Sequence, residues 1–279
     1  VFDFKGFLEC NYLQAVEVGI DPAHASFLLR YLQAEDTDDA YGRPFRCGTG
    51  DEDVPVTWIM RNFPAPTIDV QRTDFGLQIE ARRHLSESRD HVRVTNLIFP
   101  NAIVIPMSKS MAITQWHVPV DDHNCYWYAH FTSYDAPVDK PRMREQPMEL
   151  YRLPDYKPRV GRFNQWGYDP SEQEDETYTG MGMDINVHDQ WAVESPGAIT
   201  DRSRENLAGT DVAISRYRAM LLRSMDKAAS TETNAELPLH RAEGSPAIGP
   251  EWHDSIMDSG CPRKEWLDGY RDRRDKAGW

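Results

Sequence analysis

The sequence predicts an α+β fold in which helical segments flank an antiparallel sheet. Between residues 54 and 131, short runs rich in β-branched and aromatic residues follow one another, as successive strands do. Helical patterns precede and follow this region, so helices and strands do not alternate as they do in a parallel βαβ sheet. The sequence also contains neither GxGxxG nor GxxxxGK[ST], the phosphate-binding motifs of such folds.

The first helical region is predicted between Asn11 and Gln33. Apolar residues recur there at helical spacing in two groups, and Pro22 suits the first turn of a helix that begins after Asp21. We therefore expect two short helices joined near Gly19.

The central region is predicted to supply the strands. Five runs have the composition of strands: VTWIMRNF, FGLQIEARRHL, HVRVTNLIF, MAITQWHVPV and CYWYAHFTSY. His117 and its aromatic neighbours are expected to pack or to line a pocket, whereas His84 and His91 flank a charged turn and are expected to face solvent.

Beyond the strands, the sequence predicts a surface segment and a long helix. The acidic, proline-rich stretch from Ala136 to Tyr178 is expected to have little regular structure. After Thr210, a candidate N-cap, apolar residues recur at helical spacing up to Met225, which predicts an amphipathic helix. Residues 229–263 are rich in Ser, Thr, Glu, Gly and Pro and are expected to wrap the surface or contact another subunit.

Charge and cysteine content narrow the class of protein. The 279 residues include 31 Lys and Arg against 45 Asp and Glu, a net charge of −14, which disfavours nucleic acids and anionic membranes as partners. The longest apolar stretches are too short to span a membrane. Four scattered cysteines without a CxxC pair suit a reducing cytoplasm. The first residues read like the middle of a chain, so a missing N-terminal part is expected.

Asp21, His24 and Asp189 are the residues that suggest metal chemistry. Imidazole and carboxylate groups together suit ferrous iron, and a spacing of three places Asp21 and His24 on one face of a helix or helix start. The same spacing also suits a helix start capped by Asp21 with an ordinary packed or exposed histidine. Periodicity leaves both interpretations open.

Three runs of the sequence resemble one enzyme family. They are NYLQAVEVGIDPAHASFLLRY, WHVPVDD and HDQWAVESPGAITDRSRENLAGTDVAISRYRAMLL, in that order along the chain. They are similar to the catalytic domain of Rieske non-haem iron aromatic-ring oxygenase α subunits, in particular the phthalate-dioxygenase-like group. The resemblance implies a helix-grip fold, in which a curved antiparallel sheet and a long C-terminal helix enclose a pocket. It further implies a catalytic domain at residues 1–228 and a C-terminal surface extension at 229–279.

The resemblance also implies roles for residues. His24 matches the first histidine of a 2-His-1-carboxylate triad for mononuclear Fe(II), and Asp189 matches its carboxylate. Asp21 matches a catalytic aspartate that passes electrons from a neighbouring subunit's Rieske cluster. The implied partners are a small aromatic substrate, O2, a reductase or ferredoxin, and the other subunits of a homotrimer. No substrate-binding residue is assigned.

Two departures from the family pattern stand out. Leu29 occupies the position of the second histidine ligand, and a leucine cannot coordinate a metal. His188 is a weak substitute, because neighbours on a strand point to opposite faces. The chain also has no CxH…CxxH stretch, so the [2Fe–2S] cluster would require a missing N-terminal domain or another chain.

Two functions therefore remain open. The first is an oxygenase that hydroxylates or oxidatively O-demethylates an aromatic, carboxylate-bearing compound with O2. The second is a non-catalytic subunit that binds aromatic ligands and has lost the iron triad at Leu29.

Overall fold

An antiparallel sheet forms the centre of the computed structural model, which describes residues 1–32, 54–135, 137–230 and 249–277. The strand order is β1-β7-β6-β5-β4-β3-β2. The strands are β1 (Phe2–Leu8), β2 (Thr67–Arg72), β3 (Gly76–Ser86), β4 (Arg89–Ile98), β5 (Ala102–Pro106), β6 (Met111–Pro119) and β7 (Cys125–Ser133). The α+β prediction with an antiparallel sheet is confirmed.

The two faces of the sheet differ in what they contact. On β6, the period of two places Ile113, Gln115 and His117 on the inner face, while Trp116 and Val118 point outward and are more than a third exposed. On β7, the inner positions include the buried Trp127 and Phe131, along with Ala129. This inner face forms the floor of the site described below.

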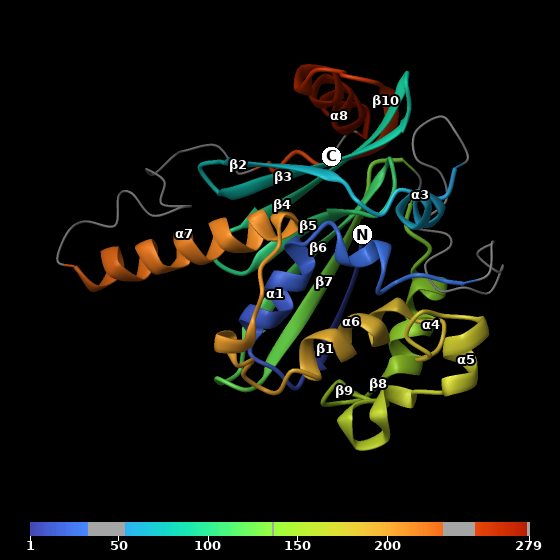
Figure 1. Ribbon diagram of the computed structural model, residues 1–279, viewed down its shortest axis with the longest axis vertical. Helices are drawn as coiled ribbons and strands as arrows, with labels where there is room; N and C mark the ends of the chain where they lie inside the picture. The colour runs from blue at the N-terminus through green and yellow to red at the C-terminus, as the bar shows by residue number, and fades with distance from the viewer. Residues whose placement is uncertain (33–53, 136, 231–248, 278–279) are drawn as a thin grey trace.

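Helices α1 (Tyr12–Ile20) and α6 (Ile185–Glu194) lie over the inner face of the sheet (Figure 1). The Asn11 side chain caps α1 by accepting a hydrogen bond from the Leu13 amide at 3.0 Å. Val16 and Ile20 are fully buried against the core of the sheet. The second short helix predicted after Asp21 is a single 3₁₀ turn, η1 (His24–Ser26).

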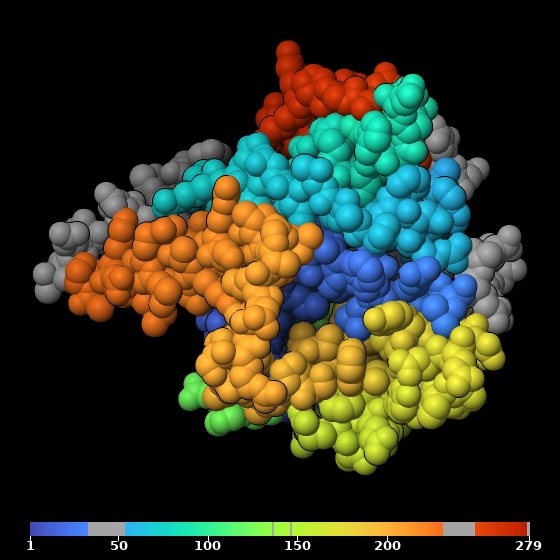
Figure 2. All heavy atoms as spheres, viewed as in Figure 1, coloured from blue at the N-terminus to red at the C-terminus, as the bar shows by residue number. Residues whose placement is uncertain are grey.

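The predicted long helix is α7 (Val212–Ala229), which extends away from the body of the molecule (Figures 1 and 2). It packs through a stripe of buried residues that includes Ala213, Tyr217 and Met220. The Tyr217 hydroxyl donates a hydrogen bond to the Pro100 carbonyl at 2.8 Å. The N-cap is Asp211, one residue beyond the expected Thr210.

Two predictions of secondary structure are wrong. The run VTWIMRNF forms helix α3 (Val56–Asn62) instead of a strand, because burial of Val56 and Ile59 at a spacing of three outweighs their β propensity. The segment from 136 to 178 is also more regular than expected. It contains α4 (Lys140–Leu150), β8 (Tyr151–Arg152), β9 (Lys157–Pro158), the 3₁₀ segment η2 (Arg162–Gly167) and α5 (Pro170–Asp175). Asp139 and Asp169 cap α4 and α5, each followed by a proline in the first turn.

The C-terminal residues add to the sheet. Strand β10 (His253–Asp258) pairs with residues Arg89–Val94 of β4, whereas β5 pairs only with the last residues of β4. Helix α8 (Arg263–Ala277) covers this corner through the buried Trp266 and Tyr270 (Figure 1). Part of the stretch expected to wrap the surface therefore belongs to the sheet. The division of the chain at residue 228 stays a prediction.

Two further observations concern the class of protein. None of the helices in the described ranges is both long and apolar enough to cross a membrane. Cys10, Cys125 and Cys261 are buried free thiols, and Cys47 lies outside the described residues.

Candidate functional site

A cavity of about 840 Å³ lies between the inner face of the sheet and the segments α1, η1, α3 and α6. Its volume falls within the range of pockets that enclose small organic ligands. The sheet supplies a largely apolar floor that includes Ile79, Ile105, Ile113, Trp127 and Phe131. Asp21, His24, Leu29 and Asp189 all line this cavity, so the structure brings the predicted site residues together.

The turn after α1 fixes the orientation of His24. The Asp21 carboxylate accepts hydrogen bonds from the backbone amides of Ala23 at 2.8 Å and His24 at 3.1 Å. The Asp21 carbonyl oxygen lies 2.6 Å from His24 Nδ1. An Nδ1–H donor to this carbonyl leaves Nε2 as the basic nitrogen, the arrangement of a metal-binding imidazole. The imidazole is thus hydrogen-bonded by the backbone carbonyl of Asp21, while Asp21 Oδ2 lies 3.9 Å from Nδ1, within ion-pair distance.

Asp189 on α6 faces this imidazole. Its Oδ1 lies 3.7 Å from His24 Nε2. Ligand atoms about 2.1 Å from one metal ion can be at most about 4.2 Å apart, so a single ion can reach both atoms. Two segments far apart in the sequence therefore bring one nitrogen and one oxygen donor together at the cavity wall.

The donor set for a facial triad is nevertheless incomplete. Leu29 lines the cavity with an alkyl side chain that has no donor atom. Within the described parts of the chain, no three His, Cys, Asp or Glu residues are arranged to hold a metal ion. The residues that the structure describes therefore do not fit a three-ligand iron centre.

His188 does not replace the missing ligand. It lies on a helix and not on a strand, contrary to the sequence-based expectation. Successive helical residues diverge by about 100°, which turns His188 into the protein interior, where it is fully buried. Its Nε2 is 2.8 Å from the Gly182 carbonyl oxygen. This contact engages one ring nitrogen, and His188 does not line the cavity that contains His24.

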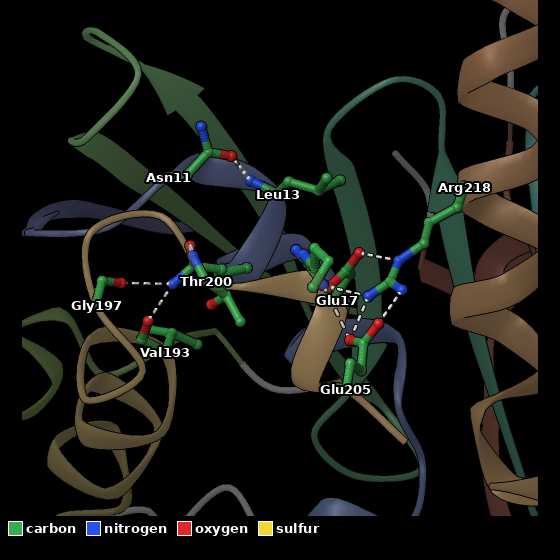
Figure 3. Close-up of polar contacts among 10 residues, drawn as sticks. Asn11, Leu13, Glu17, Val193, Gly197, Thr200, Glu205 and Arg218 are labelled. Atoms are coloured by element: carbon green, nitrogen blue, oxygen red, sulfur yellow. Dashed lines mark hydrogen bonds and ion pairs between the residues drawn. The ribbon is translucent and has the colours of Figure 1, made fainter. Parts of the chain in front are cut away.

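A hydrogen-bond network holds α1 against the end of α6 and the segment that follows it (Figure 3). Gln14 donates to the carbonyl oxygens of Val193 at 2.7 Å and Gly197 at 3.0 Å, and accepts from the Thr200 amide at 2.9 Å. Because α1 leads into the turn that carries His24 and α6 carries Asp189, this network fixes the position of the His24 nitrogen donor relative to the Asp189 oxygen donor.

Glu17, one helical turn further along α1, connects this helix to α7. Its carboxylate accepts from Arg218 at 2.6 and 2.9 Å, and Arg218 also donates to Glu205 at 2.7 Å (Figure 3). Arg202 pairs with Glu17 and, at 3.1 Å, with Glu205. The sequence reasoning missed Gln14 and Glu17. Asn11, Gln14 and Glu17 follow one another at a spacing of three, which places their side chains on one face of a helix. This pattern in the sequence could have indicated a shared polar contact surface.

Glu194 anchors the end of α6. This buried carboxylate accepts hydrogen bonds from the backbone amide of Glu9 at 2.9 Å, the indole N–H of Trp166 at 2.8 Å and the side-chain amide of Gln190 at 3.1 Å. Burial raises the pKa of Glu194 despite these donors.

Three of the other histidines had an environment predicted from the sequence. His117 is buried and lines the cavity, which confirms the expectation that it packs or lines a pocket. The His84 side chain is exposed as expected. The expectation for His91 is wrong, since it is fully buried under β10 with Nε2 at 2.6 Å from Asp254 Oδ1.

Comparison with known proteins yields one family and several relatives. The family model described as "LigXa C-terminal domain like" matches residues 3–243. The chain is 26% identical over 227 residues to the phthalate 4,5-dioxygenase oxygenase subunit of Pseudomonas putida, covering 78% of this chain and 49% of that protein. It is 27% identical over 248 residues to the 3-chlorobenzoate-3,4-dioxygenase oxygenase subunit of Comamonas testosteroni, covering 82% and 53%.

The chain thus spans about half the length of the curated relatives that it matches. Among solved structures, that of dicamba monooxygenase bound to dicamba is similar over 82% of this chain and 59% of that chain. The sequence identity is 14% and the TM-score is 0.45.

Proposed function

The chain belongs to the LigXa C-terminal domain-like family of Rieske oxygenase catalytic domains, and from this membership we propose that it serves an oxygenase acting on an aromatic compound. The reaction would be ring hydroxylation or oxidative O-demethylation with O2, and the substrate a carboxylate-bearing aromatic. The observation that carries the proposal is the cavity in which His24 and Asp189 face each other at 3.7 Å.

The residues of this chain would bind and orient the substrate. The apolar floor formed by Ile105, Ile113 and Phe131 suits an aromatic ring and excludes water from it. The network around Gln14 and Glu17 fixes the positions of His24 and Asp189 relative to each other. We derive no step at a metal, since the described residues do not complete a ligand set.

The remaining parts of the proposal follow from the family. The oxygenase would use mononuclear Fe(II) and a [2Fe–2S] cluster carried by an N-terminal domain that these residues do not include or by another chain. A reductase or ferredoxin would supply the electrons. Asp21 would carry electrons between subunits of a homotrimer.

The cavity residue Leu29 favours a second candidate function. A protein that keeps the cavity and lacks a third metal ligand could bind aromatic compounds without oxidising them. The two candidates differ in whether iron binds beside His24.

Iron binding by the wild type and two matched variants tests the proposal. Leu29→His adds a donor inside the cavity, whereas Leu28→His adds one at a neighbouring position that does not line it. Fe(II) binding would be followed by titration calorimetry and metal analysis. We expect Leu29→His to tighten Fe(II) binding at least tenfold and Leu28→His to leave it unchanged. Equal behaviour of both variants would show that the metal site is not at His24 and Asp189.

Wild-type behaviour separates the two functions. Fe(II) binding together with hydroxylated or demethylated products in the presence of O2, an electron donor and benzoate derivatives would support the oxygenase. Binding of benzoate derivatives without Fe(II) uptake would support the binding subunit.

A further inference from the structure

Gln115 places a carboxamide on the inner face of the sheet, beside α1. In the strand register it lies between Ile103 on β5 and Ala129 on β7. Gly19 of α1 sits directly above this position. A Cβ atom at Gly19 would stand 2.5 Å from Ile103 Cδ1 and 4.0 Å from Gln115 Oε1. The glycine therefore lets the helix approach the strand closely, and the carboxamide lies where α1 meets the cavity.

The Gln115 carboxamide makes no hydrogen bond to any residue in the described part of the chain. It can donate two hydrogen bonds and accept two. The side chain is half-buried, and apolar groups surround it on the floor of the cavity. A molecule that displaces water from the cavity without replacing its hydrogen bonds would leave this carboxamide without a partner, which costs about 1–3 kcal/mol. A bound molecule that supplies one is therefore favoured.

The polar groups next to Gln115 are uncharged. His117, two residues along the same face of β6, has no hydrogen-bond partner for either ring nitrogen within the described residues. Burial lowers the pKa of His117 to about 4, so the ring is neutral at pH 7. Opposite it, Trp127 donates its indole N–H to the Tyr151 hydroxyl at 3.1 Å.

The cationic residue Arg93, which also lines the cavity, is not adjacent to Gln115 in the sheet. Leu97 on β4 pairs with Ile103 on β5, which in turn pairs with Gln115 on β6, so the three residues form one row across the sheet. Arg93 precedes Leu97 by four residues on β4. At 3.3 Å per residue, Arg93 is displaced from that row by about 13 Å along the strand. Its guanidinium is also paired with Asp254 and bonded to the Pro106 carbonyl. The region around Gln115 therefore offers hydrogen bonds and little positive charge.

We propose that Gln115 is a specificity-determining residue that binds an uncharged oxygen substituent of the aromatic substrate. The carboxamide N–H donates to a hydroxyl or methoxy oxygen, and Oε1 accepts from a hydroxyl. A carboxylate is disfavoured at this position because the residues beside it on the neighbouring strands, Ile103 and Ala129, carry no positive charge to offset its desolvation. This inference rests on the proposed function, since it assumes that the cavity binds an aromatic ring.

The test uses benzoate, the three hydroxybenzoates and the three methoxybenzoates as probes, with dissociation constants from titration calorimetry. Gln115→Met keeps the length of the side chain and removes its hydrogen-bonding groups. Gln173→Met is the matched control, because it makes the same exchange at an exposed residue that does not line the cavity. Gln115→Glu is the second variant, which keeps acceptor oxygens and removes the donor.

We expect at least one oxygenated probe to bind wild type more tightly than benzoate. Gln115→Met should weaken that probe about tenfold and change benzoate binding less than twofold, since one hydrogen bond contributes about 1.4 kcal/mol. Gln115→Glu should weaken methoxybenzoates most, because they require the donor. Gln173→Met should change neither class.

Two outcomes would overturn the inference in different ways. The inference fails if wild type binds benzoate and all oxygenated probes equally, or if Gln115→Met weakens the binding of both classes equally. Either result would show that Gln115 does not bind the oxygen substituent, while the proposal that the cavity binds an aromatic ring would be unaffected. If wild type binds none of the probes, the proposed function fails and the inference fails with it.

Discussion

Replacing Gln14 with methionine tests how α1 is held in place. The substitution keeps the length of the side chain and removes three hydrogen bonds, two donated to carbonyl oxygens and one accepted from the Thr200 amide. Gln14 is only 7% exposed, so water cannot fully replace the lost partners. At about 1 kcal/mol net for each bond, the expected loss is about 3 kcal/mol of the free energy of unfolding.

The exposed Gln173 provides a matched control for this experiment. Its side chain accepts from the Tyr168 hydroxyl at 2.6 Å and donates to the Tyr178 carbonyl at 3.2 Å. Because solvent can satisfy these groups, Gln173→Met should cost less than about 0.5 kcal/mol. Urea denaturation at pH 7 measures both variants. A loss below about 1 kcal/mol for Gln14→Met would refute the view that this network holds α1.

Three further outcomes are expected from named contacts. Tyr217→Phe removes the hydrogen bond to the Pro100 carbonyl and should lower the free energy of unfolding by about 1 kcal/mol in urea denaturation. For His117, the folded-state pKa of about 4 lies below the unfolded value near 6.5, so its contribution to stability is complete above pH 6.5 and is lost as the pH falls toward 4. Thermal unfolding from pH 8 to 4 should thus show a shallower acid-side decline for His117→Phe than for wild type, and parallel curves would contradict this assignment. Arg218→Met should raise the pKa of Glu205, which Arg218 holds below its usual value, as carboxylate titration by NMR would reveal. An unchanged Glu205 pKa would show that the pair contributes nothing in solution.

Much of the fold follows from local patterns. The runs of alternating residues in β3, β4, β6 and β7 and the helical spacing in α7 are visible in the sequence, and the structure has these elements. The run that forms α3 was misjudged because its apolar residues satisfy either period. Helix α4 was missed because its capping aspartate and following proline were interpreted as features of a loop.

The candidate site could be predicted only in part. The spacing of Asp21 and His24 indicated a helix-start turn, and the structure shows that turn with the Asp21 carboxylate accepting hydrogen bonds from the amides of Ala23 and His24. The pairing with Asp189 came from resemblance alone, because no local pattern relates residues so distant in the sequence. Gln115 was hidden within a strand, where its lack of partners becomes visible only when α1 and the neighbouring strands are in place.

The sequence by itself determined the types of element, their order and the antiparallel character of the sheet, because propensity and periodicity act over a few residues. It also determined that Leu29 supplies no ligand atom, since that follows from its chemistry. The tertiary structure alone decided that β10 covers His91, that Gln14 connects α1 with the segment after α6, and that His24 faces Asp189. These outcomes depend on which distant surfaces pack together, and packing is governed by the shape and burial of the whole core.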